Sequence, residues 1–404
     1  MLSNRHAPVR QATPEPTSRR WDLRARHGVL AFVAVAAVLY LVVAVVSPDI
    51  PTPPHPALVP PFNGPSWLRG WAQWDSGWYY RIAHDGYSFA GRRQSTVAFF
   101  PVYPLVVRAV AVVVGNTYVA GILVTFLCGA ALAGLLATWL RPRMSPAAAW
   151  TALAAFLLFP YAFYLYGVVY ADALFIATVL AAFLLLENDQ PVLAGVAAAV
   201  STAARPLGIV LVVALAVRAL ERRGALRPAS GRLVDWSRVR RGDAGVLLGV
   251  LGLAAWCLFL WHRFGDPFAF ATAEAGWQQT PGPTTWFKVQ FFHDMAHIWN
   301  LRWWGVFYVA HSVLTLAAVC LVPRVFRRFG LGYGIYVLLL VGISALSTQN
   351  FFGMARYLLG AFPIFAVVGE FLAEPPLWRR LVLPASGIAL VAVTAIFGTG
   401  YYVS

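Results

Sequence analysis

Long apolar stretches with almost no charge recur along this chain and limit its fold more than any other feature. Residues 29–46, 117–140 and 331–347 are three examples. Each is close to the roughly 20 residues that an α-helix needs to cross a bilayer. Only 12% of the 404 residues are charged, about half the fraction of an average soluble domain. The pattern predicts an all-α, polytopic integral membrane protein, whereas a β-barrel would show short alternating strands.

Arginine clusters between the apolar stretches predict how the chain crosses the membrane. RPR at 141–143, RALERRGALR at 218–227 and PRVFRRFG at 323–330 are such clusters. By the positive-inside rule, loops of this kind face the cytoplasm. The formal net charge of +15 therefore indicates membrane orientation, and no nucleic-acid partner is expected.

The apolar stretches and the clusters together predict a tail followed by a single transmembrane domain. Residues 1–28 are expected to form a disordered, basic cytoplasmic tail. Residues 29–404 are expected to form one domain with about nine full transmembrane helices, each near the length that a bilayer requires. These helices are expected at 29–47, 117–140, 147–165, 169–187, 244–262, 305–323, 331–347, 357–373 and 381–400.

Three further segments complete this topology. A hairpin of two short helices is expected at 191–220, because Arg205–Pro206 interrupts that stretch and proline breaks a helix. The segment 97–115 is apolar but contains two prolines, and we expect an interfacial or partly inserted helix there. It belongs to the first of two long external loops, which are expected at 48–116 and 263–304.

This topology places the unusual polar segments on one face of the membrane. The external face is expected to carry 71–87, 170–175, 204–208, 263–304 and 348–357. Acids, arginines and aromatic residues that converge from distant segments are typical of a functional site in a helical membrane protein. The sequence therefore predicts a site at the external face.

The segment WAQWDSGWYYRIAHDGY at 71–87 offers the first candidates for that site. Asp75 precedes a short predicted helix that Gly86 ends, so Asp75 fits either a helix N-cap or a catalytic base. His84 and Asp85 lie at the end of this helix, where histidine also suits the helix dipole. Trp74 fits either an interfacial aromatic belt or stacking on a ligand.

Two arginines lie at sensitive places in the apolar stretches. Arg205 occupies the helix break, where it fits either phosphate binding or a structural ion pair with Asp172. Arg356 fits either phosphate or sugar binding, or a helix-end position that reaches the membrane surface.

The motif HDMAH at 293–297 places two histidines at zinc-like spacing. A third ligand is not evident nearby in the sequence. We therefore assign no metal site and expect no cofactor, although a divalent metal is left open.

Several of these motifs resemble one family of enzymes. WAQWDSGWYYRIAHDGY followed by AFFPVYPLVVR (98–108) resembles the PIG-V-type mannosyltransferases of the GT-C class of membrane glycosyltransferases. YADALF (170–175), ARPLGIVLVV (204–213) and ARYLLGAFP (355–363) look like later elements of that family. Asp172 stands where the family usually has glutamate, and Ala173 where it often has serine. The resemblance implies a GT-C-like transmembrane fold.

The resemblance also implies an activity, a donor and roles for the candidate residues. It implies inverting transfer of a hexose, with mannose favoured, from a polyprenyl-phosphate sugar to an acceptor hydroxyl on the non-cytoplasmic face. Asp75 is the implied catalytic base. The implied substrate-binding residues are Arg205, Arg356, Asp172, Arg81, His84, Asp85, Trp74 and Tyr103. A prenyl phosphate leaves as a stable anion, so one carboxylate suffices for the acceptor proton, and arginines suit the phosphate.

Other interpretations of the sequence stay open. A lipid or glycan transporter or flippase is the main alternative, because discontinuous helices such as 191–220 occur at transporter binding sites. The acceptor is expected to be a lipid-linked or cell-envelope glycan, with membrane lipids as the surrounding partners. The bias toward arginine over lysine suggests a GC-rich bacterial genome and hence the bacterial plasma membrane.

Overall fold

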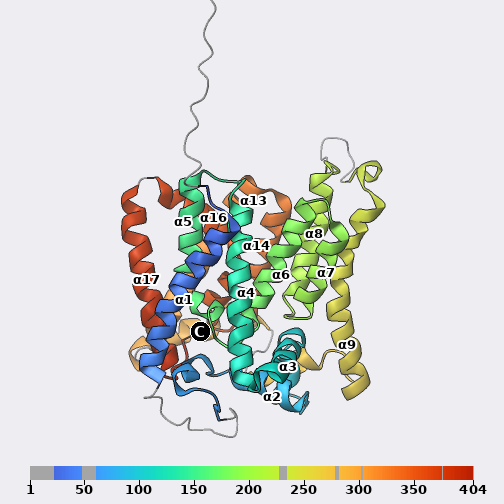
Figure 1. Cartoon of the computed structure of the whole chain (residues 1–404). Helices are drawn as coiled ribbons and strands as arrows, with labels where there is room; N and C mark the ends of the chain where they lie inside the picture. The colour runs from blue at the N-terminus through green and yellow to red at the C-terminus, as the bar shows by residue number, and fades with distance from the viewer. Residues whose placement is uncertain are drawn as a thin grey trace, which may run out of the picture.

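The fold is an all-helical bundle, as the sequence predicts. The computed structural model describes residues 22–47, 61–226, 234–277, 282–301, 304–374 and 376–403. The expected tail therefore lies largely outside the described residues. Across these ranges the elements are α-helices and short 3-10 helices, with one isolated bridge between Leu226 and Val234. Figure 1 shows the long helices side by side.

Five helical segments are long and apolar enough to cross a membrane. They are α1 (Ala25–Val46), α4 (Thr117–Leu140), the continuous segment η8–α9 (Arg241–Gly249 and Val250–Phe264), α13 (Trp304–Phe329) and α17 (Pro376–Gly398). Shorter helices stand beside them: α5 (Pro146–Leu157), α6 (Asp172–Glu187), α7 (Pro191–Thr202), α8 (Gly208–Arg222), α14 (Leu331–Ser347) and α16 (Phe362–Ala373). Their composition and length define an integral membrane protein.

The hairpin predicted at 191–220 is confirmed. The helix α7 ends at Thr202, α8 begins at Gly208, and Arg205 and Pro206 lie in the break between them. A hydrogen bond joins this break to the start of the short helix α3 (Val102–Val114). The N–H of Val102 donates to the carbonyl of Ala203 at 3.1 Å. The segment predicted at 97–115 thus contains a short helix, α3, at the end of the bundle (Figure 1).

The expected helix at 147–165 is wrong in its second half. The helix α5 ends at Leu157 and α6 begins only at Asp172. Pro160 explains the early end, since proline excludes helical geometry from the residue before it and lacks an N–H donor. The chain from 161 to 171 is buried and non-helical except for a short 3-10 turn at Ala162–Leu165.

Buried irregular backbone needs partners for its polar groups, and α4 supplies several of them. The hydroxyl of Thr125 on α4 donates to the carbonyl of Val168 at 2.8 Å. Gly129 permits the close approach, because a Cβ there would lie 2.2 Å from the carbonyl oxygen of Leu165. On the other side, the Tyr40 hydroxyl of α1 donates to the carbonyl of Tyr166 at 3.1 Å.

Three other boundaries also differ from the expectation. The first helix starts at Ala25 rather than at 29, and α13 continues through Pro323 to Phe329. The predicted helix 357–373 is divided into α15 (Met354–Leu358) and α16, which begins with proline at its second position. Pro363 fits the first turn of a new helix but not the interior of a continuous one.

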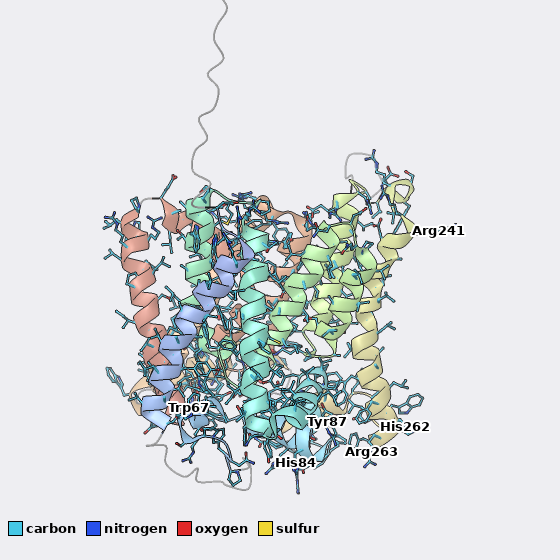
Figure 2. The ribbon with its side chains drawn as sticks, viewed as in Figure 1. Trp67, His84, Tyr87, Arg241, His262 and Arg263 are labelled. Carbon is cyan, nitrogen blue, oxygen red and sulfur yellow. The ribbon has the colours of Figure 1, made fainter. Side chains whose placement is uncertain are left out.

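The bundle has two chemically different ends. The first helix begins at one end, and Arg241 lies there (Figures 1 and 2). We call this the arginine-rich end, because Arg141, Arg218 and Arg223 also belong to it. The opposite end carries α2 (Ser76–Asp85), α3 and the carboxyl terminus of the chain. The polar motifs of the sequence converge at this second end.

Candidate active site

Asp75 stands directly before α2, but its carboxylate does not cap that helix. It occupies the N-cap position without a side-chain cap hydrogen bond. Instead its backbone N–H donates to the hydroxyl of Tyr170 at 3.0 Å. The preceding residue, Trp74, has a φ of 54°, which a bulky residue rarely adopts and which often marks a functional position. Asp75 thus occupies the N-cap position, but its side chain does not cap the helix. The carboxylate is therefore available for other contacts.

Arg356, on α15, faces this carboxylate. Its Nη1 lies 3.5 Å from Oδ2 of Asp75, and its Nε lies 3.9 Å from Oδ1 of Asp172. The guanidinium also lies over the rings of Tyr164 and Tyr170, at 5.4 Å and 5.2 Å from their centres. The structure therefore brings together three segments that are far apart in the sequence: the residue before α2, the stretch 164–172 and α15.

Two donors of Arg356 lack a hydrogen bond. Its Nε and Nη1 are buried and have no hydrogen-bond partner among the described residues, and the side chain is 10% exposed. The distances to Asp75 and Asp172 are those of ion pairs rather than of hydrogen bonds. A buried donor without a partner costs free energy. These N–H groups are therefore suited to an anionic group that enters the site.

Arg205 makes the ion pair that the sequence offered as one of its two interpretations. Its Nη2 donates to Oδ2 of Asp172 at 2.5 Å, and only 2% of the Asp172 side chain is exposed. Asp172 is the first residue of α6, where the helix dipole also favours a negative charge. Arg205 further lies over the ring of Tyr357 at 5.8 Å. Asp172 thus contacts both arginines. It accepts a hydrogen bond from Arg205 and forms a longer ion pair with Arg356.

Sequence reasoning missed a third carboxylate at this site, Glu274. It is the last residue of α10 (Ala269–Glu274), in the segment predicted to be external. The segment packs on α2, since Trp277 contacts Trp78 with ring centres 5.5 Å apart. Burial, with a smaller contribution from the charge of Asp75, raises the pKa of Glu274 to about 7. The only sequence signal was an acid within an aromatic stretch of a predicted external loop.

Burial also governs the ionisation of Asp75. Removal from water raises the pKa of the Asp75 carboxyl, and the neighbouring charge of Arg356 opposes that rise. Tyr79, on the first turn of α2, feels Arg205, Asp172 and Asp75, and burial raises the pKa of its hydroxyl. A carboxyl whose pKa is moved toward neutrality and whose neighbour is cationic can exchange a proton during turnover.

The structure places the other predicted site residues around this centre or away from it. The Tyr103 side chain is fully buried, and its hydroxyl bonds to Thr125 at 2.8 Å and to the carbonyl of Gly121 at 3.0 Å. Trp74 is 42% exposed and contacts Tyr402 with ring centres 4.8 Å apart. Tyr103 therefore packs behind the site, whereas Trp74 lies at its rim.

Arg81, His84 and Asp85 do not join the charge cluster. His84 and Asp85 are exposed and bond to each other at 2.6 Å. Figure 2 shows His84 at the edge of the bundle, at the end opposite Arg241. Arg81 lies 5.7 Å from the ring centre of Trp78. Their roles in substrate binding stay predictions.

The paired histidines of the external segment stand apart as well. His293 and His297 lie on α12 (Val289–Ala296) and directly after it, with ring centres 4.7 Å apart. One nitrogen of His297 already contacts the carbonyl of His293 at 2.9 Å. Among the residues that the structure describes, no group of three or more histidine, cysteine or acidic side chains is arranged to hold a metal.

The fold and the site thus define an integral membrane protein with a buried charge cluster at one end of its bundle. No protein-family model and no curated protein matches the chain. Solved structures do show similarity. One is ArnT from Cupriavidus metallidurans bound to undecaprenyl phosphate, with a TM-score of 0.48 and 16% identity. That match covers 93% of this chain and 76% of ArnT.

A second similarity is to the oligosaccharyltransferase of Archaeoglobus fulgidus in the apo form. Its TM-score is 0.45 and its identity 13%, over 92% of this chain and 56% of that one. The archaeal oligosaccharyltransferase AglB in complex with an inhibitory peptide and a dolichol-phosphate gives a TM-score of 0.41 at 11% identity. That match covers 91% of this chain and 55% of AglB. Similarity at this level does not by itself assign the chain to a family or an activity.

Proposed function

We propose that this chain is an inverting membrane glycosyltransferase of the GT-C type, which moves a hexose from a polyprenyl phosphate to an acceptor hydroxyl. The observation that carries the proposal is the pair of buried N–H donors of Arg356 that make no hydrogen bond and lie beside the carboxylate of Asp75. Such a pair offers an anion-binding group and a base within one site. The sequence motifs at 71–87 and 98–108, which resemble the PIG-V-type mannosyltransferases, favour mannose as the hexose.

The chemistry needs one base and one anion-binding group. The acceptor oxygen attacks the anomeric carbon from the face opposite the phosphate, and the bond between that carbon and the phosphate oxygen breaks. The polyprenyl phosphate leaves with the bonding electrons. The acceptor proton passes to the carboxylate of Asp75, which is the base in this scheme. The configuration at the anomeric carbon inverts because a single displacement occurs.

In this proposal Arg356 binds the phosphate of the donor. Its free donors can replace their long contacts with Asp75 and Asp172 by short hydrogen bonds to phosphate oxygens, which a planar guanidinium grips in pairs. Asp75 would then lose part of its cationic neighbour as the donor binds. A carboxylate that loses such a partner has a higher pKa and is a better base. Donor binding and base activation are therefore coupled in this geometry.

In this proposal Arg205 is the second arginine that contributes to donor binding. Its ion pair with Asp172 holds the helix break of α7 and α8 against α6. The same break gives the irregular backbone that membrane proteins use next to polar ligands. We place the sugar or the phosphate next to this pair, with Arg205 as its second positive charge.

The membrane side and the acceptor follow from the same argument. The positive-inside rule places the arginine-rich end in the cytoplasm, so the site end faces outward. We propose the plasma membrane of a bacterium and a lipid-linked or cell-envelope glycan as acceptor. Trp74 is 42% exposed, and in this proposal the acceptor enters beside it from the outer face.

The proposal is tested with the purified protein in liposomes that contain labelled polyprenyl-phosphate mannose and a membrane extract as acceptor source. Transfer of label from prenyl phosphate to a new product, with inverted configuration at the anomeric carbon, is the expected result. Arg356→Lys keeps the charge but loses the planar fork, so we expect a higher KM for the donor. Label that crosses the bilayer while the phosphate–sugar bond stays intact would identify a transporter instead.

A further inference from the structure

A cavity of about 360 Å³ opens at the arginine-rich end, far from the charge cluster of the site. It lies between the last turns of α13 and α16. Its walls are formed by Arg324, Arg327, Arg328, Val367, Glu370 and Phe371. The cavity therefore combines several positive charges with an apolar wall at the arginine-rich ends of α13 and α16.

The charges in this cavity are not balanced. Arg328 forms an ion pair with Glu370, with its Nε 2.8 Å from the carboxylate. Arg324 lies over the ring of Phe371 at 4.3 Å, and Arg327 makes no ion pair with any described residue. Three arginines thus face a single acid.

A second cavity at the same end shows the opposite arrangement. It measures about 460 Å³ and includes Asp189, Arg223, Arg240 and Asp243 in its lining. Arg223 bridges Asp189 at 2.7 Å and Asp243 at 2.8 Å, and Arg240 pairs with Asp189 at 3.3 Å. Two arginines meet two acids, so this cavity is already neutral. The contrast marks the first cavity as the one that lacks an anion.

We propose that the cavity between α13 and α16 binds the headgroup of an anionic phospholipid from the leaflet at the arginine-rich end. Basic cavities between transmembrane helices on the cytoplasmic side suit such headgroups, and guanidinium groups suit a phosphodiester. Phe371, which is 43% exposed, and Val367 supply apolar surface for the glycerol and the first acyl carbons. Free phosphate would gain nothing from this apolar wall.

The test is native mass spectrometry of the full chain, titrated with phosphatidylglycerol or with phosphatidylcholine. The native protein should retain phosphatidylglycerol at least about tenfold more tightly, since each arginine near the surface contributes about 1 kcal/mol. Arg324→Gln with Arg327→Gln should abolish that preference. The matched control, Arg238→Gln with Arg240→Gln at the same end, should keep it.

Two further measurements separate lipid binding from unfolding and from binding of free phosphate. Arg324→Lys with Arg327→Lys keeps the charge and should retain most of the preference, which shows that the glutamine pair did not merely unfold the protein. Inorganic phosphate at millimolar concentration should not displace the lipid. Equal retention of both lipids by the native protein, an unchanged preference in the glutamine pair, or full displacement by phosphate would each overturn the proposal.

Discussion

At the scale of single residues, the unusual feature of Asp75 is that its carboxylate does not cap the helix that follows it. It stands at an N-cap but makes no cap hydrogen bond, and it is preceded by Trp74 in a left-handed conformation. Its partner is Arg356, which comes from the other end of the sequence. A carboxylate held in this way costs stability that a simple cap would have supplied, about 1 kcal/mol. The arrangement is consistent with a role in chemistry.

Asp75→Asn tests this role. Asparagine keeps the shape of the side chain but cannot accept a proton, so we expect a turnover loss of about 10²-fold or more, as for the loss of a general base. The thermal midpoint should fall only modestly, because the ion pair with Arg356 is long, at 3.5 Å, and no cap hydrogen bond is lost. The rate of label transfer and the melting temperature are the two measurements. Near-full activity of the variant would remove Asp75 from the mechanism.

Glu274→Gln tests the second carboxylate through its pH dependence. The folded-state pKa of about 7 lies above the ordinary value of about 4.3, so folding disfavours the ionised form. Stability should therefore fall as the pH rises from about 4.3 toward the folded-state pKa and level off above it, and the glutamine variant should lose that fall. The melting temperature, followed from acidic to mildly alkaline pH, is the measurement.

The same variant should also change the pH profile of transfer. Because Glu274 titrates with a pKa of about 7, a limb of kcat/KM that reports this group should disappear in Glu274→Gln. Asp235→Asn, an exposed carboxylate at the arginine-rich end, is the control and should leave the profile unchanged. An unaltered limb in Glu274→Gln would place Glu274 outside the reaction.

At the scale of elements, Lys288 joins the external segment to the bundle. It is the one lysine among 31 basic residues, it is 7% exposed, and its ammonium donates to the carbonyls of Ala345 and Thr348. These carbonyls end α14, where the helix dipole favours a cation. The ammonium also lies 4.9 Å from the ring centre of Phe351. Lys288 thereby fixes the connection that leads from α14 to Arg356.

Lys288→Met should loosen this connection. Two carbonyls lose a donor, so we expect a destabilisation of about 1–3 kcal/mol together with weaker donor binding through a displaced Arg356. Lys288→Arg keeps the charge and should recover part of both effects. Arg263→Met, an exposed basic residue on the last turn of α9, is the matched control. A melting temperature of Lys288→Met equal to that of the native protein would contradict this role.

At the scale of the whole molecule, every buried charge of the proposed site lies at one end of the bundle, and the paired arginine clusters lie at the other. Asp75 and Arg356 meet at the site end, whereas Glu187 receives Arg218 at 2.8 Å at the other end. The proposed orientation, with the site outward, rests on the positive-inside rule. Under this proposal, the site reaches only a donor and an acceptor at the outer face.

Single cysteines test the orientation in a background without native cysteines. Ser66→Cys and Thr284→Cys, both exposed at the site end, should react with an impermeant thiol reagent in intact cells. Arg238→Cys, which is exposed at the opposite end, should react only after the membrane is opened. The reverse pattern would turn the site toward the cytoplasm and remove the proposed outer-face reaction.

The sequence by itself predicted the class of fold and most of its elements. Apolar stretches near 20 residues in length can only be buried in a bilayer as helices, and α1, α4 and the break at Arg205–Pro206 follow this rule. The motif around Asp75 also pointed to the end of the bundle where the charge cluster lies. These features are local, because length, hydropathy and proline act on the chain where they occur.

Only the tertiary structure decided which charges meet. The partners of Arg356, Asp75 and Asp172, are far from it in the sequence, and no local pattern states such a distance. Glu274 was missed for the same reason, and the buried segment after Leu157 was predicted as helix because its aromatic residues are as apolar as a helix would be. Hydropathy indicates how strongly a residue favours burial. Which neighbour it is buried against depends on the packing of all the helices together, and that packing formed the site.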